Sequence, residues 1–110
     1  MSYGVKILDA NQYLRVHKML AHYYGTLEII LMSAHYNKWE DSGQTKYTVT
    51  REELQDRSTI PVKDQEAIEN KLIELELLIR TSEGLPVRFH YVVDAEKFDS
   101  EVQQILSNRR

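Results

Sequence analysis

The amino-acid sequence predicts a single α+β domain, mainly helical, over residues 1–110. Three observations support this fold class. Several segments repeat apolar residues every three or four positions, as amphipathic helices do. One segment after residue 86 alternates apolar and polar residues, as a half-buried strand does, and a capping motif followed by a turn separates two of the helices. With 42% hydrophobic and 28% charged residues, four glycines and two prolines, the composition is that of one globular domain with one core.

Two helices are expected in the N-terminal half. After a short extended start, residues 9–11 offer N-cap groups for a helix with apolar residues at helical spacing, which ends at Gly25. Thr26 is expected to cap the second helix, which stops within the polar residues 37–44. Because apolar residues cover most sides of this second helix, we expect it to be central.

A helix-turn-helix is expected at about residues 50–79. Residues 46–49 alternate and favour a short strand before it. Thr50 and Glu53 then form a capping box, in which Thr50 accepts the backbone N–H of Glu53 and the Glu53 side chain reaches back to Thr50. A short helix, a turn at residues 58–61 and a long helix complete the motif.

A two-stranded wing is expected next, at about residues 80–93. Residues 82–86 form a tight loop before the alternating strand, and residues 78–81 supply its partner. Asp94 is expected to cap a last helix at about residues 94–108. The residues that this helix turns inward are Phe98, Val102, Ile105 and Leu106.

The predicted order of elements is that of a winged helix-turn-helix domain with an additional C-terminal helix. No internal repeat suggests another architecture. The alternative that the pattern leaves open is a small helical bundle with an incidental hairpin.

Segments spread over most of the chain also resemble a known family. They are VHKMLA at residues 16–21, TLEIILMSAHY at 26–36, YTVTREEL at 47–54, STI at 58–60, LELLI at 75–79 and YVVD at 91–94. This set resembles the N-terminal winged helix domains of DnaD-like replication proteins and of replisome organisers from phages and plasmids of Gram-positive bacteria. The resemblance implies a protein of a mobile genetic element that binds DNA or organises a complex on it.

The long helix departs from that family's pattern in its charge. Residues 62–79 carry two basic and five acidic side chains, whereas the rest of the chain is balanced. On the outward face of this helix, where groove-reading domains of this kind usually carry Arg, Lys, Ser or Asn, the sequence has Asp64, Glu66, Glu69, Glu74 and Glu76. A carboxylate near a phosphate replaces attraction by repulsion. We therefore expect the first helix and the wing to contribute more to DNA binding than the donors of the long helix, which are Lys63, Gln65 and Lys71.

The first helix and the wing each carry a candidate basic surface. Arg15, Lys18 and His22 recur at positions i, i+3 and i+7 in a stretch without acidic residues, so they line one helix face that could neutralise phosphates. The alternative is a solvated face without a ligand. Arg80, Arg88 and His90 flank the wing, where an arginine fits a narrow minor groove. The alternative here is an ion pair with Glu83 across the loop.

A third candidate surface surrounds the turn of the helix-turn-helix. Its residues are Arg51, Arg57, Ser58, Thr59 and Lys63. Hydroxyl groups and helix N-termini in such a turn commonly hold phosphates, so these residues could position the domain on DNA. The terminal Arg109 and Arg110 are more simply interpreted as a solvated tail.

The sequence offers little for catalysis. There is no cysteine, the four histidines lack a metal-ligand spacing, and no glycine-rich phosphate loop is present. We therefore expect no enzyme activity, no cofactor and no metal. Tyrosines at helical spacing are interpreted as core residues rather than base-stacking platforms. The sequence shows no apolar run typical of a membrane span or signal peptide, so a cytoplasmic protein is expected.

The sequence thus predicts a double-stranded DNA-binding protein of a mobile genetic element that serves replication, conjugative transfer or its regulation. The alternative is a protein-interaction or oligomerisation module of a replication or transfer complex, with the acidic long helix as its partner surface. A homodimer is expected, because a single small domain has limited core in which to hide a second apolar stripe. The residues assigned to this dimer interface are Ile73, Leu77, Val102, Ile105 and Leu106.

Overall fold

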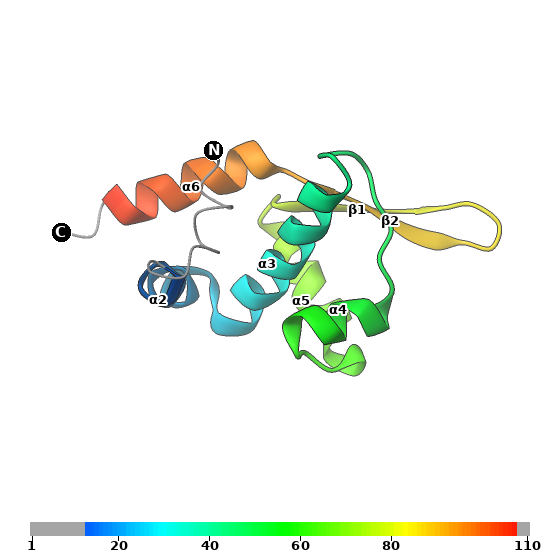
Figure 1. The fold of residues 1–110 in the computed structure, drawn as a ribbon, viewed down its shortest axis with the longest axis horizontal. Coiled ribbons are helices and arrows are strands. Elements are labelled where there is room, and N and C mark those ends of the chain that lie inside the picture. The colour runs from blue at the N-terminus through cyan, green and yellow to red at the C-terminus, as the bar shows by residue number, and fades with distance from the viewer. Residues whose placement is uncertain (1–12, 108–110) are drawn as a thin grey trace.

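The computed structural model describes residues 13–107, which form five helices and one β-hairpin (Figure 1). The elements are α2 (Tyr13–Tyr24), α3 (Thr26–Asp41), α4 (Arg51–Ser58), α5 (Val62–Glu74), β1 (Leu78–Glu83), β2 (Arg88–Val93) and α6 (Ala95–Ser107). The protein is therefore α+β and mainly helical, as predicted. The extended start and the cap predicted at residues 9–11 lie outside the described residues.

Helix α3 is the central element. It packs against α2, α4, α5 and β2, and every residue from 31 to 36 is buried. Helices α2 and α6 contact each other at one end of the elongated molecule, which measures 50 × 26 × 25 Å, and the hairpin extends from the other end (Figure 1). The prediction that the second helix is central is confirmed. The helix is apolar on most sides because neighbours surround it.

The ends of the early helices follow local rules. Gly25 has φ 106, a conformation that favours glycine, and α2 ends just before it, as predicted. Gly25 is also the N-cap of α3, so Thr26 is the first helical residue and not the predicted cap. At α4, Thr50 Oγ1 accepts the backbone N–H of Glu53 at 3.0 Å, which confirms half of the capping box. The Glu53 carboxylate does not return to Thr50, because it accepts from Lys38 and Arg57 instead.

Helix α5 ends five residues before the predicted end at residue 79. Glu76 adopts a left-handed conformation, with φ 61. Its N–H donates to Ile73 O at 2.9 Å, and the N–H of Leu77 donates to Leu72 O at 3.1 Å. These two bonds form a Schellman motif, in which the buried side chains of Leu72 and Leu77 lie at the positions that normally touch. Because this motif usually contains glycine, the sequence carries no obvious stop here.

Strands β1 and β2 are antiparallel and pair from Leu78 with Val93 to Glu83 with Arg88. The predicted partner strand is confirmed and begins where expected, at Leu78. The strand predicted at residues 46–49 is reduced to one bridge, in which Tyr47 and Tyr91 exchange backbone hydrogen bonds of 3.0 and 2.8 Å. This bridge joins the segment before α4 to the hairpin.

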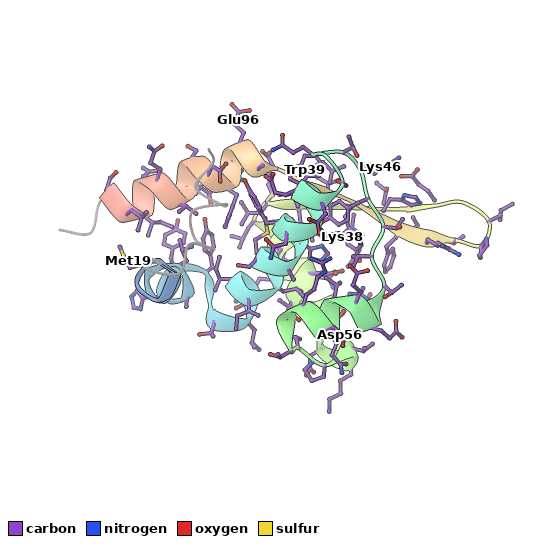
Figure 2. All side chains as sticks on the ribbon, viewed as in Figure 1. Met19, Lys38, Trp39, Lys46, Asp56 and Glu96 are labelled. Carbon is purple, nitrogen blue, oxygen red and sulfur yellow. The ribbon has the colours of Figure 1, made fainter. Side chains whose placement is uncertain are left out.

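The C-terminal helix α6 begins as predicted. Asp94 Oδ1 accepts the backbone N–H of Lys97 at 3.0 Å, and Glu96 projects outward from the first turn (Figure 2). Phe98 and Val102 are fully buried against the core. Between residues 13 and 107, no helix is long and apolar enough to cross a membrane.

The apolar stripe assigned to a dimer interface lies largely inside the chain. Leu77 and Val102 are fully buried within one copy. Ile73, Ile105 and Leu106 are half-buried and pack on the same core. The reason for expecting a dimer, a stripe too large for one small core, therefore does not apply to these residues.

Candidate nucleic-acid interface

The outward face of α5 is less acidic than the sequence suggested. Gln65, Ile68, Glu69 and Leu72 point into the core. The exposed residues on and beside the opposite face are Lys63, Asp64, Glu66, Ala67, Asn70, Lys71 and Glu74. Placing Glu69 and Glu76 on this face was wrong, since Glu69 is fully buried and Glu76 lies beyond the helix end, near Lys97. Two lysines and three acidic residues, Asp64, Glu66 and Glu74, remain, so this side of α5 carries a net charge of −1 instead of the −3 of the whole segment 62–79.

Glu69 is the centre of a buried ion cluster that joins α5 to four other elements. Its carboxylate accepts from His35 Nε2 on α3 at 2.9 Å and forms an ion pair with Arg51 Nη1 on α4, also at 2.9 Å. It also accepts from Arg80 Nη1 on β1 at 3.0 Å and from the Tyr91 hydroxyl on β2 at 3.1 Å. A buried carboxylate is stable only when opposite charges and donors compensate its desolvation. The cluster therefore fixes α5 relative to α3, α4 and the hairpin.

The protonation of the cluster follows from its surroundings. Burial raises the pKa of Glu69, but the hydrogen bonds from His35 and Arg80 and the charges of His35 and Arg51 outweigh it and bring the pKa below its ordinary value. Burial, above all, raises the pKa of Tyr47 well beyond its ordinary value. Tyr47 therefore keeps its proton, its hydroxyl oxygen lies 2.9 Å from His35 Nδ1, and His35 Nε2–H donates to the Glu69 carboxylate.

Arg80 is held on three sides. Besides Glu69, its Nη2 donates to Asn70 Oδ1 at 2.8 Å, and its guanidinium lies 4.8 Å from the centre of the Phe89 ring. The ion pair with Glu83 that was the alternative for the wing is taken by Lys46, whose Nζ lies 2.8 Å from Glu83 Oε1. Lys46 comes from the loop after α3 and lies beside the hairpin (Figure 2).

Most of the residues predicted around the turn point inward or are paired. Arg51 contacts Glu69, and Arg57 forms ion pairs with Glu53 at 3.0 Å and Asp41 at 3.3 Å. The buried Ser58 hydroxyl donates to Leu54 O and accepts from the Ile60 N–H. Gln65, predicted as a DNA contact, is fully buried, and its amide donates to the backbone oxygens of Arg51 and Ile60. Thr59 and Lys63 remain exposed.

The other predicted contacts are spread over the surface. Arg15 and Lys18 belong to α2, but their side chains lie outside the described part of the structure, and His22 on the same helix is exposed. On the hairpin, Arg88 is exposed and His90 is half-buried. Lys71 is exposed and lies 3.9 Å from Glu28. The structure therefore brings Lys63, Asn70 and Lys71 together on α5, next to Arg80, rather than uniting the three predicted surfaces.

Sequence analysis missed the buried cluster, although one pattern could have revealed part of it. Gln65, Ile68, Glu69 and Leu72 follow the spacing i, i+3, i+4 and i+7, which marks one helix face. Two polar residues on an apolar face predict buried, hydrogen-bonded groups. His35 is likewise a polar residue among apolar ones, in the segment of α3 from 31 to 36 that is buried. The identity of the partners depends on elements far apart in the chain.

Within residues 13–107, no group of three or more histidine or acidic side chains is arranged to hold a metal ion. Comparison of the chain with protein-family models, with curated proteins and with solved structures finds no significant match. Functional inference therefore depends on the chain's own side chains.

Proposed function

We propose that this chain is a winged helix-turn-helix domain that binds double-stranded DNA, in the replication or conjugative transfer of a mobile genetic element or in its regulation. The order α3, α4, α5, β1 and β2, with the bridge between Tyr47 and Tyr91, supports the winged helix assignment. In that architecture α5 is the helix that enters a major groove and the hairpin is the wing.

The observation that carries this proposal is the outward face of α5. Lys63, Asn70 and Lys71 are exposed there, and Asn70 is bonded to Arg80 of the wing. Two cations can contact phosphates while an amide faces the bases, which is the division of roles seen in groove-binding helices. The buried Glu69 adds no uncompensated negative charge beneath this face, because Arg51 and Arg80 both pair with it.

DNA affinity is expected to be modest and strongly dependent on salt. An acidic protein of net charge −3 has to rely on a few local phosphate contacts. Besides the α5 lysines, Arg88 on the wing and His22 on α2 are exposed. Each phosphate contact releases counterions, so a small number of contacts still gives a clear salt slope.

Fluorescence anisotropy with a short, labelled duplex of mixed sequence tests the proposal, at salt concentrations between about 50 and 200 mM. We expect binding at the lower concentration that weakens several-fold at the higher one. Poly-glutamate as competitor controls for non-specific attraction to acidic polymers. A slope near zero, or no binding at the lowest salt, would contradict DNA binding.

A specific observation favours a second candidate, a protein-interaction module. Seven large apolar side chains are exposed in the described part of the structure, and four of them belong to the hairpin: Ile79, Leu85, Val87 and Phe89. Leu85 is 98% exposed. Exposed apolar groups gathered on one element are typical of interaction surfaces. If the chain does not bind DNA in the salt series, this candidate becomes the preferred function.

A further inference from the structure

We propose that Asn70 is a specificity-determining residue that recognises a base only as a hydrogen-bond donor, and that it prefers guanine and rejects cytosine. This inference rests on the proposed DNA-binding function and deepens it. It concerns one residue at the centre of the exposed α5 face, and it follows from the way in which Arg80 orients that residue.

Arg80 determines which end of the Asn70 amide faces outward. The guanidinium group carries donors and no acceptor, so the amide oxygen must face it. Oδ1 accordingly accepts from Arg80 Nη2 at 2.8 Å. The opposite end of the amide, Nδ2 with its two hydrogens, is therefore directed away from Arg80.

Arg80 is itself held firmly. Its other terminal nitrogen donates to the fully buried Glu69 at 3.0 Å, its plane lies over Phe89, and its side chain is only 16% exposed. A rotation of the Asn70 amide would break the bond to Arg80 and place donors against donors. The orientation is thus fixed before any DNA arrives, which favours specificity over adaptability.

The position of Asn70 suits contact with a base edge. Lys63 and Glu74 lie two turns before and one turn after it on the same face, and the small Ala67 lies one turn before it. The methyl group of Ala67 leaves room for close approach of a base pair. An exposed side chain of intermediate length between flanking charged residues can reach a base edge while a neighbouring lysine contacts a phosphate.

The donor-only amide leads to a definite base preference. An unrestrained asparagine recognises adenine by using its oxygen and its nitrogen together. Here the oxygen already accepts from Arg80, so Nδ2 must find acceptors. In the major groove guanine offers two acceptors, N7 and O6, whereas cytosine offers only its N4 amino donor. Guanine at the contacted position is therefore favoured, and cytosine places donor against donor.

Selection from a randomised duplex library, followed by sequencing and anisotropy on the selected site, tests this inference. We expect one position at which the wild-type chain prefers guanine over cytosine by about fivefold or more. Asn70→Asp should reverse the preference at that position to cytosine. One oxygen of the new carboxylate would pair with Arg80, and the other would accept from cytosine N4.

Two further variants separate the possible outcomes. Asn70→Ala should abolish the preference at that position and leave the others unchanged. Lys71→Ala is the control and should weaken binding to all sequences alike. If wild-type protein binds DNA but neither Asn70 variant alters the base preference, the inference is overturned and the proposed function stands. If wild-type protein binds no duplex at any salt concentration, the proposed function fails as well. Thermal melting of each variant confirms that the chain remains folded.

Discussion

Glu69 shows how a single residue can serve the fold although it lies in a helix proposed to face DNA. Its carboxylate is fully buried, accepts from His35, Arg80 and Tyr91, and forms an ion pair with Arg51. Removing one partner of such a cluster leaves the other charges poorly compensated. The stability of the domain and the orientation of the wing therefore depend on the same side chain.

We predict that Glu69→Gln lowers the free energy of unfolding by about 3 kcal/mol. Arg51 and Arg80 are partly exposed, so water offsets some of the loss. Glu66→Gln removes the same charge from an exposed position of the same helix, and it should change stability by less than about 0.5 kcal/mol. Urea unfolding measures the free energy of unfolding of both variants. Equal changes in the free energy of unfolding for the two variants would show that the buried cluster stabilises the fold no more than an exposed charge does.

Acidification should reduce the difference in free energy of unfolding between wild type and Glu69→Gln. The pKa of Glu69 lies below its ordinary value of 4.5 in the folded chain. Below pH 4.5 the unfolded chain therefore takes up a proton at this site before the folded chain does, and acid destabilises the fold. The difference should be fully present above that pH and disappear as the pH falls through the lower, folded pKa. Urea curves from neutral pH downward test this, and a difference that grows in acid would refute it.

At the scale of elements, the end of α5 decides where the wing begins. The helix ends because Glu76 is left-handed, and the N–H of Leu77 returns to Leu72. A residue other than glycine in this conformation costs about 1 kcal/mol. Two interactions of Leu77 offset this cost. Its side chain is fully buried, and its carbonyl accepts the N–H of Asp94.

Glu76→Gly should accordingly stabilise the protein by roughly 0.5–1 kcal/mol. The variant loses an ion pair of Glu76 with Lys97 at 3.3 Å, but the Glu76 side chain is 82% exposed and such a pair contributes little. Glu74→Gly, at the last residue of α5, is the matched control and should cost up to about 1 kcal/mol. Thermal melting should move in opposite directions for the two variants. A loss at both positions would show that the left-handed turn carries no strain.

The exposed α5 lysines should matter for DNA more than the paired cations around the turn. Lys63→Ala combined with Lys71→Ala should weaken binding and reduce the salt slope by about two, one unit for each lost phosphate contact. Arg57→Ala is the control, because Arg57 pairs with Glu53 and Asp41. Fluorescence anisotropy with one labelled duplex measures the DNA affinity and the salt slope of the double lysine variant and of Arg57→Ala. A larger effect of Arg57→Ala would mean that DNA displaces these ion pairs and approaches the turn instead.

At the scale of the whole molecule, one chain accommodates its apolar stripes within its own core. α6 packs against α2, its Phe98 ring lies beside Tyr24 of α2 and Tyr36 of α3, and its Val102 is fully buried. Leu77 is buried beneath the start of the hairpin. A small domain can hide these residues because α6 supplies an additional layer that a three-helix domain lacks.

We therefore expect a monomer of 13.0 kDa in sedimentation equilibrium at tens of micromolar. Val102→Ser should destabilise that monomer by at least about 2 kcal/mol, because Val102 is a core residue. It should not change the mass of the folded species. A species of twice the mass that Val102→Ser dissociates without loss of stability would instead restore the dimer predicted from the sequence.

The sequence by itself determined the kind and order of the elements, because those patterns are local. Helical spacing, the alternation of β2, the glycine at Gly25 and the caps at Thr50 and Asp94 each involve neighbours within a few residues. Such patterns place the helices, the turn and the hairpin without knowledge of their partners. They also predicted correctly that α3 would be central, since an almost wholly apolar helix has to be surrounded.

Only the tertiary structure decided which charged residues face outward. Glu69 appeared to be part of an acidic surface, yet it lies inside because His35, Arg51 and Arg80 arrive from three other elements to compensate it. The early end of α5 likewise depends on a buried Leu77 and on a contact with Asp94 far along the chain. The physical reason is that the free energy of a buried charge is set by partners distant in sequence, and local periodicity contains no information about them.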